Sequence, residues 1–476
     1  MGSNPTSSAR PPRGVGRRVT GDADLRARRI AAGLSQARLA ELSGVAQHRL
    51  SGGERGARSL RPEERAKLEA VLRDPGRIGA ARARPKRFQP HVRSERPREP
   101  QSRARPGLTA GNPEYLRELA RLEEKASAGF SALSLFAGAG GMSLGFRSAG
   151  FAVGGFVEID EELAAIYAAN FPEARRIGAD VRRFGNREMD AFLEAHGPVD
   201  ALIGGPPCQG FSLTGKRRED DPRNALFRDY LRVLGRIRPK LAVMENVARL
   251  TSMRGASGRS VGADIAQGFR EAGYDVRACL LDAQDFGVPQ HRERVFFLAV
   301  DRRLGRAPEP PRPGHGEGRA ALRSFGDACS DLEFLEAGEQ GEDPLHRAVA
   351  HPDHVLDWLR EVPEGASAHD NQDPAKRPPS GYNTTYKRQI WNQPAATVQT
   401  TFGMISGSRN VHPHATRALT IREAARLQSF PDSFRFSGKL GTIRTGIGNA
   451  APPLLARAVA EEMARRLRSL TEKPQA

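Results

Sequence analysis

The chain has 476 residues, enough for two or three domains, and carries a formal net charge of +18. Its cysteines, Cys208, Cys279 and Cys329, are too few and too scattered for a disulfide framework or a cysteine-rich zinc site, so we expect a reducing compartment and no metal. The sequence has no apolar stretch long enough to span a bilayer and no apolar signal core. These features predict a cytoplasmic protein without a membrane partner.

The basic charge is concentrated towards the N-terminus. Residues 1–110 contain 25 Lys and Arg against 10 Asp and Glu, whereas the other 366 residues contain 49 against 46. A basic excess at one end favours a nucleic-acid partner, although a solvated basic tail without a specific partner would have the same composition.

The N-terminal region divides into three parts by composition. Residues 1–20 are rich in Gly, Ser, Pro and Arg and are predicted to be a disordered tail. Residues 21–73 carry apolar residues at roughly helical spacing and are predicted to be an all-α domain. Residues 74–111 are rich in Arg and Pro and are predicted to be an extended linker.

Within the predicted all-α domain, a helix beginning near Ser35, a turn at Gly44 and a short helix over residues 45–50 predict a helix-turn-helix. The arrangement resembles repressor-type helix-turn-helix domains, whose second helix enters the major groove of DNA. That resemblance places three residues near bases or phosphates: Gln47, His48 and Arg49. A helical bundle used for docking is the alternative.

A cofactor cleft is predicted from three successive strand ends. A buried strand over residues 132–136 runs into the glycine-rich turn 137–142, which lets the backbone approach a nucleotide-like ligand. Taken alone, this turn is compatible with NAD, FAD, S-adenosylmethionine or tight packing. Glu158 follows the second strand, where an acidic side chain suits ribose hydroxyls without selecting one cofactor. Asp180 follows the third strand, and such a carboxylate alone is often only a helix cap.

The stretch 204–212 is the most informative part of the chain. Two glycines and two prolines end a buried strand and place Cys208 on a stiff turn, where a thiol suits nucleophilic catalysis, although most free cysteines are small buried hydrophobes. Glu245 ends the strand that follows, so it can face the same pocket and protonate a ring nitrogen while the thiolate adds to the ring. Arg292 and Arg294 point the same way and could hold a phosphate or a carbonyl oxygen, although such a run alone is more typical of a solvated face.

Six segments, in chain order, resemble the motifs of the DNA (cytosine-5) methyltransferase family. They are residues 136–141 (FAGAGG), 205–212 (GPPCQGFS), 245–247 (ENV), 290–294 (QHRER), 419–431 (LTIREAARLQSFP) and 447–453 (IGNAAPP). The resemblance covers about residues 130–468 and implies an α/β fold with the doubly wound, Rossmann-like sheet of S-adenosylmethionine-dependent methyltransferases. Two departures are mild: Ser134 stands where the family more often has an acidic residue, and Ala451 where it usually has valine.

The resemblance also implies roles for individual residues. Cys208 would attack C6 of a cytosine flipped out of the duplex, Glu245 would contact N3 and the exocyclic amine, and Arg294 would hold the base carbonyl with Arg292 in support. The residues expected around S-adenosylmethionine are Phe136, Gly138, Gly140, Gly141, Glu158, Ile159, Asp180, Val181, Pro206 and Asn449. A mobile loop that closes over the DNA would include Gln209 and Ser212.

The family's organisation divides the remaining chain into a catalytic cofactor-binding domain (112–300), a small target-recognition region (301–413) and a return to the catalytic domain (414–470). Residues 301–380 contain 10 Lys and Arg against 16 Asp and Glu, which is unexpected for a groove reader. The base readers are therefore expected within 382–409, where the candidates are Lys387, Arg388, Gln399, Thr400, Thr401 and Arg409. Residues 301–342 are rich in Pro and Gly and are predicted to be partly disordered.

The sequence thus predicts an enzyme that methylates C5 of cytosine in a specific sequence of double-stranded DNA, acting as a monomer associated with the nucleoid. The family implies a cognate restriction endonuclease in the same system, without physical association, and the N-terminal domain would bind DNA and regulate transcription. Two alternatives stay open: a helix-turn-helix regulator on a catalytically retired scaffold, and an RNA-directed relative with the same chemistry. An enzyme that methylates exocyclic amines would have an aromatic residue where this chain has Cys208.

Overall fold

The computed structural model describes residues 23–32, 34, 36–45, 49–50, 60–74, 106–124, 129–207, 226–253 and 258–471. The chain divides into two compact units, Met1–Gln101 and Ser102–Ala476. Several predictions fall outside the described residues: the tail 1–20, and the site residues Gln47, His48, Cys208, Gln209 and Ser212.

The N-terminal unit is helical where it is described. Its helices include α1 (Ala23–Ala31), α2 (Gln36–Ser43) and α4 (Pro62–Leu72). Their apolar spacing buries one small core, formed by Leu25, Leu34, Leu39, Ala40, Val45, Leu50, Leu68 and Val71. Because residues 46–48 of the predicted second helix lie outside the described residues, the helix-turn-helix geometry stays a prediction.

The second unit is built on a seven-stranded sheet with the order β3-β2-β1-β4-β5-β7-β6. The strands are β1 (Phe130–Leu135), β2 (Phe151–Val157), β3 (Arg175–Gly178), β4 (Ala201–Gly204), β5 (Leu241–Val247), β6 (Tyr274–Asp282) and β7 (Glu293–Asp301). β1 to β5 run parallel, whereas β7 is antiparallel to both β5 and β6. The chain order reverses between β1 and β4, and a ligand cleft is expected at the carboxyl ends of the strands there.

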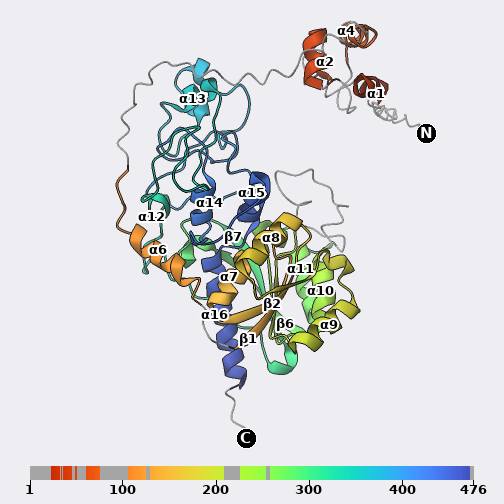
Figure 1. The fold of residues 1–476 in the computed structure, drawn as a ribbon, viewed down its shortest axis with the longest axis vertical. Helices are drawn as coiled ribbons and strands as arrows, with labels where there is room; N and C mark the ends of the chain where they lie inside the picture. The colour runs from red at the N-terminus through yellow and green to blue at the C-terminus, as the bar shows by residue number, and fades with distance from the viewer. Residues whose placement is uncertain are drawn as a thin grey trace, which may run out of the picture. The chain divides into compact units, whose positions relative to one another are not determined.

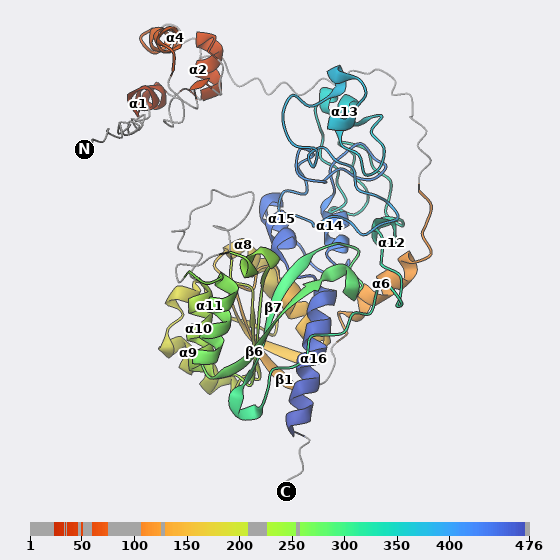
Figure 2. The same cartoon turned by 180° about the vertical axis from the view of Figure 1, so that it is seen from behind.

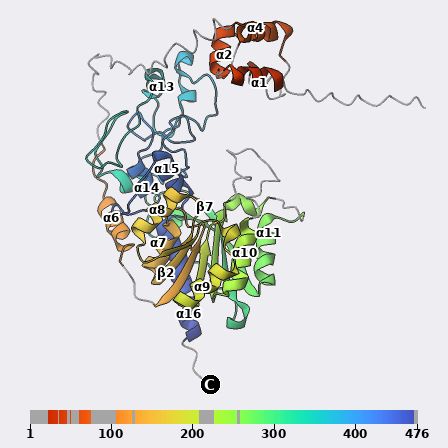
Figure 3. The same ribbon diagram turned by 45° about the vertical axis from the view of Figure 1, so that its right-hand side comes forward.

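Helices cover both faces of this sheet (Figures 1 and 3). One face packs on α7 (Gly141–Ser148), α8 (Glu161–Asn170) and α16 (Pro453–Thr471), and the other on α9 (Asn186–His196), α10 (Leu226–Ile237) and α11 (Val261–Glu271). Successive residues of one strand enter opposite cores: Ile203 faces the first core and Leu202 the second. Strands buried on both faces explain the continuous apolar runs in the sequence, and the doubly wound α/β prediction is confirmed.

The other α-helices in the described part of the second unit have at most ten residues. They are α6 (Asn112–Arg121), α12 (Phe325–Cys329), α13 (Asp353–Leu359), α14 (Ile421–Leu427) and α15 (Leu440–Asn449). Around α13, residues 350–418 form mostly loops with a small core of their own, which includes Val355, Leu359, Val362, Ala368, Ile405, Val411 and Ala418 (Figure 2).

Two predictions need correction, one about disorder and one about where the linker ends. Residues 301–342, predicted to be partly disordered, are all described, and Phe325 and Ala328 are fully buried in the main core. Thr109, assigned to the linker, donates its hydroxyl to Asp327 Oδ1 at 2.8 Å, so the folded body already includes residues before α6.

Among the described helices, none has the length and apolar character to cross a membrane. Within the same residues, no group of three or more His, Cys, Asp or Glu side chains is placed to hold a metal ion.

Candidate active site

A cavity of about 630 Å³ opens at the carboxyl ends of β1, β2, β4 and β5. It is lined by all ten residues predicted to surround the cofactor: Phe136, Gly138, Gly140, Gly141, Glu158, Ile159, Asp180, Val181, Pro206 and Asn449. Glu245 and Arg294 line the same cavity, as does Pro207, the last described residue before Cys208. The sheet therefore brings the predicted cofactor residues and two of the predicted catalytic residues to one place.

The glycine-rich turn after β1 requires glycine at specific positions. A Cβ atom at Gly140, where φ is 103°, would lie 2.5 Å from the ring of Phe171, and one at Gly141 would lie 2.5 Å from the carbonyl oxygen of Ala451. Gly138 also has a positive φ, 55°, but the space beside it is open. The turn can therefore pass close to a ligand in the cavity.

Glu158 at the end of β2 braces this turn. Its Oε2 accepts the N–H of Gly138 at 2.7 Å and its Oε1 accepts the N–H of Asp160 at 2.9 Å. Burial raises the pKa of Glu158, and the backbone hydrogen bonds oppose that shift. Each oxygen keeps further acceptor capacity, so the carboxylate can still receive ribose hydroxyls.

Asp180 and Ile159 occupy the outer part of the cavity. Asp180 caps the short 3₁₀ turn Val181–Arg183 and pairs with Arg182 at 2.6 Å, and this ion pair lowers the pKa of Asp180. Ile159 leaves 61% of its surface exposed although it is a large apolar side chain. An exposed apolar side chain on a cavity wall is suited to cover the flat face of a purine.

Glu245 and Arg294 form a buried charged pair between neighbouring antiparallel strands. Arg294 Nε lies 2.9 Å from Glu245 Oε1, but that oxygen has no aligned hydrogen bond with any described residue. Burial raises the pKa of Glu245, while Arg294 pulls it down. Glu245 thus lines the cavity with one carboxyl oxygen unused in hydrogen bonding to the described residues, and a carboxyl group so placed can donate or accept a proton.

Arg292 does not hold a ligand beside Arg294, as one reading of the sequence suggested, but lies behind the cavity wall. Its side chain is only 1% exposed and does not line the cavity. The guanidinium instead donates to the carbonyls of Val398, Gly448 and Ala450 at 3.0, 2.8 and 3.0 Å. Gly448 and Ala450 flank Asn449 in the chain, so these hydrogen bonds from Arg292 hold the backbone that places Asn449 in the cavity wall.

Asn246 is a site residue that sequence reasoning did not single out. Its Nδ2 donates to the carbonyl of Pro206 at 3.0 Å, and its Oδ1 accepts the N–H of Val247 at 2.8 Å. It therefore fixes the start of the Pro-Pro-Cys segment against the strand that carries Glu245. The only signal in the sequence was its place between Glu245 and Val247.

The predicted DNA-reading residues have different environments. Arg388 is 1% exposed, and its guanidinium donates to carbonyls that include those of Leu359, His412 and Ala415, so its assignment as a base reader is wrong. Lys387 and Gln399 are partly exposed. Arg49 pairs with Glu64 through two hydrogen bonds, at 2.9 and 2.7 Å, so its guanidinium links residue 49 to α4.

Comparison with known proteins agrees with this geometry. Residues 130–465 match the model of the C-5 cytosine-specific DNA methylase family. The chain belongs to this family. It is therefore a DNA cytosine-5 methyltransferase that uses S-adenosylmethionine as its methyl donor.

Individual relatives cover the same part of the methyltransferase. The Type II methyltransferase M1.HphI of Haemophilus parahaemolyticus is 40% identical over 333 residues, which are 69% of this chain and 85% of that protein. M.DdeI of Desulfomicrobium norvegicum is 35% identical over 372 residues, with 70% and 88% covered. A solved putative DNA modification methyltransferase encoded within an E. coli prophage is 25% identical with a TM-score of 0.56, and the match covers 72% of this chain and 100% of that one.

The cavity of this methyltransferase fits the cofactor. Buried carboxylate oxygens at Glu158, apolar walls at Phe136 and Ile159, and a close backbone turn suit the ribose, the purine and the amino-acid part of S-adenosylmethionine. The family model begins at residue 130, so the N-terminal unit and α6 lie outside the match.

Proposed function

We propose that this methyltransferase acts through a covalent adduct between Cys208 and C6 of a cytosine turned out of the duplex. The proposal rests on one observation: Glu245, Arg294 and the Pro206–Pro207 segment line the same cavity as the cofactor residues. The cofactor supplies an electrophilic methyl group when bound.

The residues of the chain would share the remaining chemistry. The thiolate of Cys208 adds to C6 while Glu245 gives its proton to N3, and this makes C5 nucleophilic. Arg294 binds the carbonyl oxygen of the base and stabilises the negative charge that develops there. After methyl transfer, loss of the C5 proton to water expels the Cys208 thiolate from C6 and restores the ring double bond. N3 then returns its proton to Glu245, which restores the enzyme and leaves neutral 5-methylcytosine.

The covalent step is tested with tritiated S-adenosylmethionine and duplex DNA. Wild-type protein should label cytosine, and Cys208→Ala should not. DNA that carries 5-fluorocytosine should give an adduct stable to denaturation, because fluorine cannot leave as a cation. Cys279→Ser is the matched control, since Cys279 is buried on β6. Label or adduct formation by Cys208→Ala would refute the mechanism.

We further propose that residues 301–413 select the target sequence and that the protein acts on DNA as a monomer in a restriction–modification system. The small separate core around α13 supports an independent recognition region, and the relatives named Type II methyltransferases support the biological setting. Incubation with DNA and with tRNA as alternative acceptors separates a DNA enzyme from an RNA-directed one. Labelled tRNA with unlabelled DNA would contradict the proposal.

The N-terminal unit is proposed to be a helix-turn-helix that adds DNA affinity and regulates transcription. Support comes from its compact helical core and from the basic excess of residues 1–110.

A further inference from the structure

The arginines near the end of the recognition region differ in what they bind. Arg377 Nε donates to the carbonyl of Asn371 at 2.6 Å, Arg388 is buried among carbonyls, and Arg417 pairs with Glu423. Arg409 is exposed, and the structure gives its guanidinium no hydrogen bond or ion pair with any described residue. It is therefore available to an external ligand.

The backbone at Arg409 is held in a conformation that non-glycine residues rarely adopt. Its φ is 52°, in the left-handed region. Its N–H donates to the carbonyl of Thr384 at 2.9 Å, and its own carbonyl accepts Gln389 Nε2 at 2.5 Å. Such strain persists only where the surroundings enforce it, and it gathers at functional sites.

The segment paired with Arg409 presents an exposed aromatic residue. Tyr382 is 81% exposed and begins a tight turn in which both the N–H and the hydroxyl of Thr385 donate to its carbonyl, at 2.8 and 2.7 Å. Asn383 Nδ2 donates to Asp370 Oδ1 at 2.6 Å and so fastens the turn to the body of the region. Thr385 also forms an isolated antiparallel β-bridge with Ser408. Tyr382 and Arg409 therefore lie on two adjacent segments that are hydrogen-bonded to each other.

This pair of segments is connected to the active site through residues 400–404. Asn410, next to Arg409, donates from Nδ2 to the carbonyls of Thr401 and Met404 at 2.8 and 2.9 Å. Thr400 packs so closely on Gly448 that a Cβ there would collide with its backbone. Gly448 precedes Asn449 in the cavity wall, so a continuous packed path joins Arg409 to the cofactor site.

We propose that the Tyr382–Thr384 turn and Arg409 form the edge that reads bases beside the target cytosine, with Arg409 binding the O6 and N7 atoms of a guanine in the major groove. The guanidinium fork matches these two acceptors, and a rigid exposed tyrosine gives contact area at low entropic cost. This inference rests on the proposed role of residues 301–413 in target selection.

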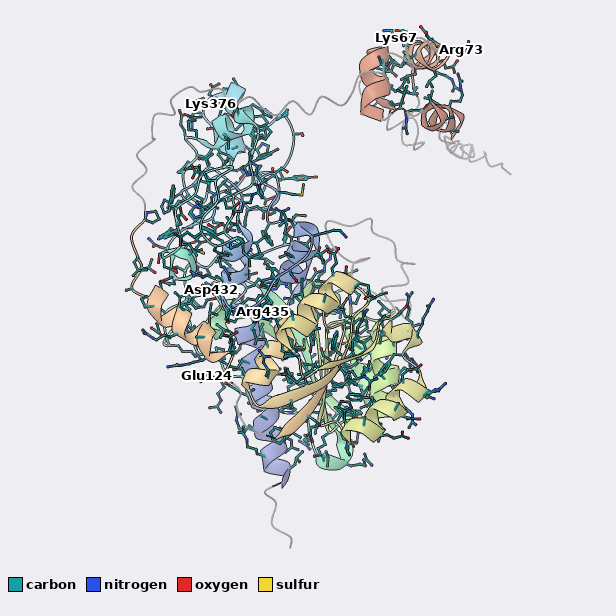
Figure 4. The ribbon with its side chains drawn as sticks, viewed as in Figure 1. Lys67, Arg73, Glu124, Lys376, Asp432 and Arg435 are labelled. Carbon is teal, nitrogen blue, oxygen red and sulfur yellow. The ribbon has the colours of Figure 1, made fainter. Side chains whose placement is uncertain are left out.

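The test is bisulfite sequencing of a randomised plasmid library methylated by full-length variants. Arg409→Ala should lower discrimination for guanine at one position of the site by about ten- to a hundredfold, and Arg409→Lys should not restore it, because lysine lacks the bidentate fork. Tyr382→Ala should raise KM for DNA and broaden the sites used. Lys376→Ala is the control, since Lys376 pairs with Glu361 at the outer end of this region (Figure 4).

The possible results distinguish failure of this inference from failure of the proposed target selection by residues 301–413. An unchanged methylation pattern in Arg409→Ala overturns the inference, and so does a uniform loss of activity on all sequences that Arg409→Lys repairs, because that result describes a phosphate contact. A wild-type protein that methylates cytosine without sequence preference would refute target selection by residues 301–413 instead.

Discussion

At the scale of single residues, Glu245 and Arg294 are buried together and each depends on the other for a counter-charge. Burial lowers the pKa of Arg294 and raises that of Glu245, and their mutual attraction opposes both shifts. A carboxyl with a raised pKa keeps its proton to higher pH than an ordinary glutamate. Glu245 is therefore better suited to give a proton to a ring nitrogen than its residue type alone would indicate.

Replacement of Glu245 by Gln should lower kcat by on the order of 10²- to 10⁴-fold, the usual contribution of a positioned acid or base. As pH rises through the raised pKa, wild-type Glu245 loses its proton, so the wild-type rate should decline on the alkaline side for this reason. The variant should lack that part of the pH–rate profile. Cofactor binding, measured by calorimetry, should change little. A variant with wild-type kcat would contradict the assignment.

Replacement of Asn246 by Ala should leave the carbonyl of Pro206 buried without its donor, at a cost of about 1–3 kcal/mol in the free energy of unfolding. The start of the catalytic segment would also lose its anchor, so kcat should fall more than cofactor affinity. Asn246→Asp keeps the shape but removes the donor, and it should be at least as defective. Retained activity in Asn246→Asp would show that the hydrogen bond does not position the segment.

The sequence predicted that Arg294 lies in the active site, but it did not reveal which groups Arg292 and Arg388 bind. Residue type alone does not distinguish these arginines from Arg294 and Arg409. The fold shows that Arg292 and Arg388 donate to buried backbone carbonyls. The partners of Arg292 lie more than 100 residues away at Val398, Gly448 and Ala450. A short sequence motif cannot reveal partners so far away in the chain. The cofactor residues were predictable because each lies within such a motif or at the end of a predicted strand, whereas the role of a buried arginine was not.

At the scale of elements, α14 shows how a charged segment can be fully internal. All seven residues of Ile421–Leu427 are buried. The charged side chains are paired: Glu423 with Arg417, Arg422 with Asp343 and Asp432, and Arg426 with Asp331 and Asp432 (Asp432 is labelled in Figure 4). Helical periodicity alone would have put these charges in solvent.

Strand prediction worked where strands are buried on both faces and was incomplete at the antiparallel edge. β4 and β5 appear as apolar runs that end at the predicted catalytic residues. β6 was not predicted, because Asp275 and Arg277 interrupt its apolar residues and it lies at the edge of the described sheet beside β7. Edge strands are half solvated, so their sequence carries a weaker signal.

Helix α6 precedes the residues that match the family model, yet it packs into the folded body of the second unit. Tyr115 and Leu122 are fully buried, and the Tyr115 hydroxyl donates to the carbonyl of Arg426 at 2.5 Å. Arg323, itself only 6% exposed, takes its counter-charges from Glu114 and Glu118 of α6. Figures 1 and 2 show α6 beside α12.

Deletion of residues 1–105 should therefore leave the melting transition of the catalytic unit unchanged, whereas deletion of residues 1–128 should destabilise it strongly. The larger deletion removes several buried side chains, at about 2–5 kcal/mol each, and leaves Arg323 without its partners. Tyr115→Phe is the mild counterpart and should cost about 0.5–1.5 kcal/mol. Thermal melts of the variants decide the point, and equal stability of the two deletions would contradict it.

At the scale of the whole molecule, the two units differ in charge: nearly all the excess positive charge precedes residue 111. The recognition region carries an acidic excess in its first 80 residues, so it is poorly equipped to attract DNA over distance. The proposed functions therefore imply two contributions to DNA binding: attraction by the N-terminal unit that does not depend on sequence, and selection of the target by residues 301–413.

This division predicts the effect of salt on DNA binding. Deletion of residues 1–105 removes 25 Lys and Arg and 10 Asp and Glu. The deleted protein should bind DNA more weakly at low salt, and the slope of log Kd against log salt should become shallower by about 0.9 for each phosphate that the shortened protein no longer neutralises. Its methylation pattern should stay the same, and kcat at saturating DNA should be close to that of the full chain.

A point variant tests whether charge or fold carries this effect. Glu64 holds Arg49, and this ion pair lowers the pKa of Glu64 to about 2, so the pair stays ionised at any ordinary assay pH. Arg49→Gln should lower the melting temperature of the N-terminal unit. It should change the slope of log Kd against log salt by no more than about 0.9, the contribution of one phosphate. If deletion of residues 1–105 left both affinity and slope unaltered, the N-terminal unit would not be a DNA-binding module. Its helices would then be the docking bundle that the same apolar spacing allows.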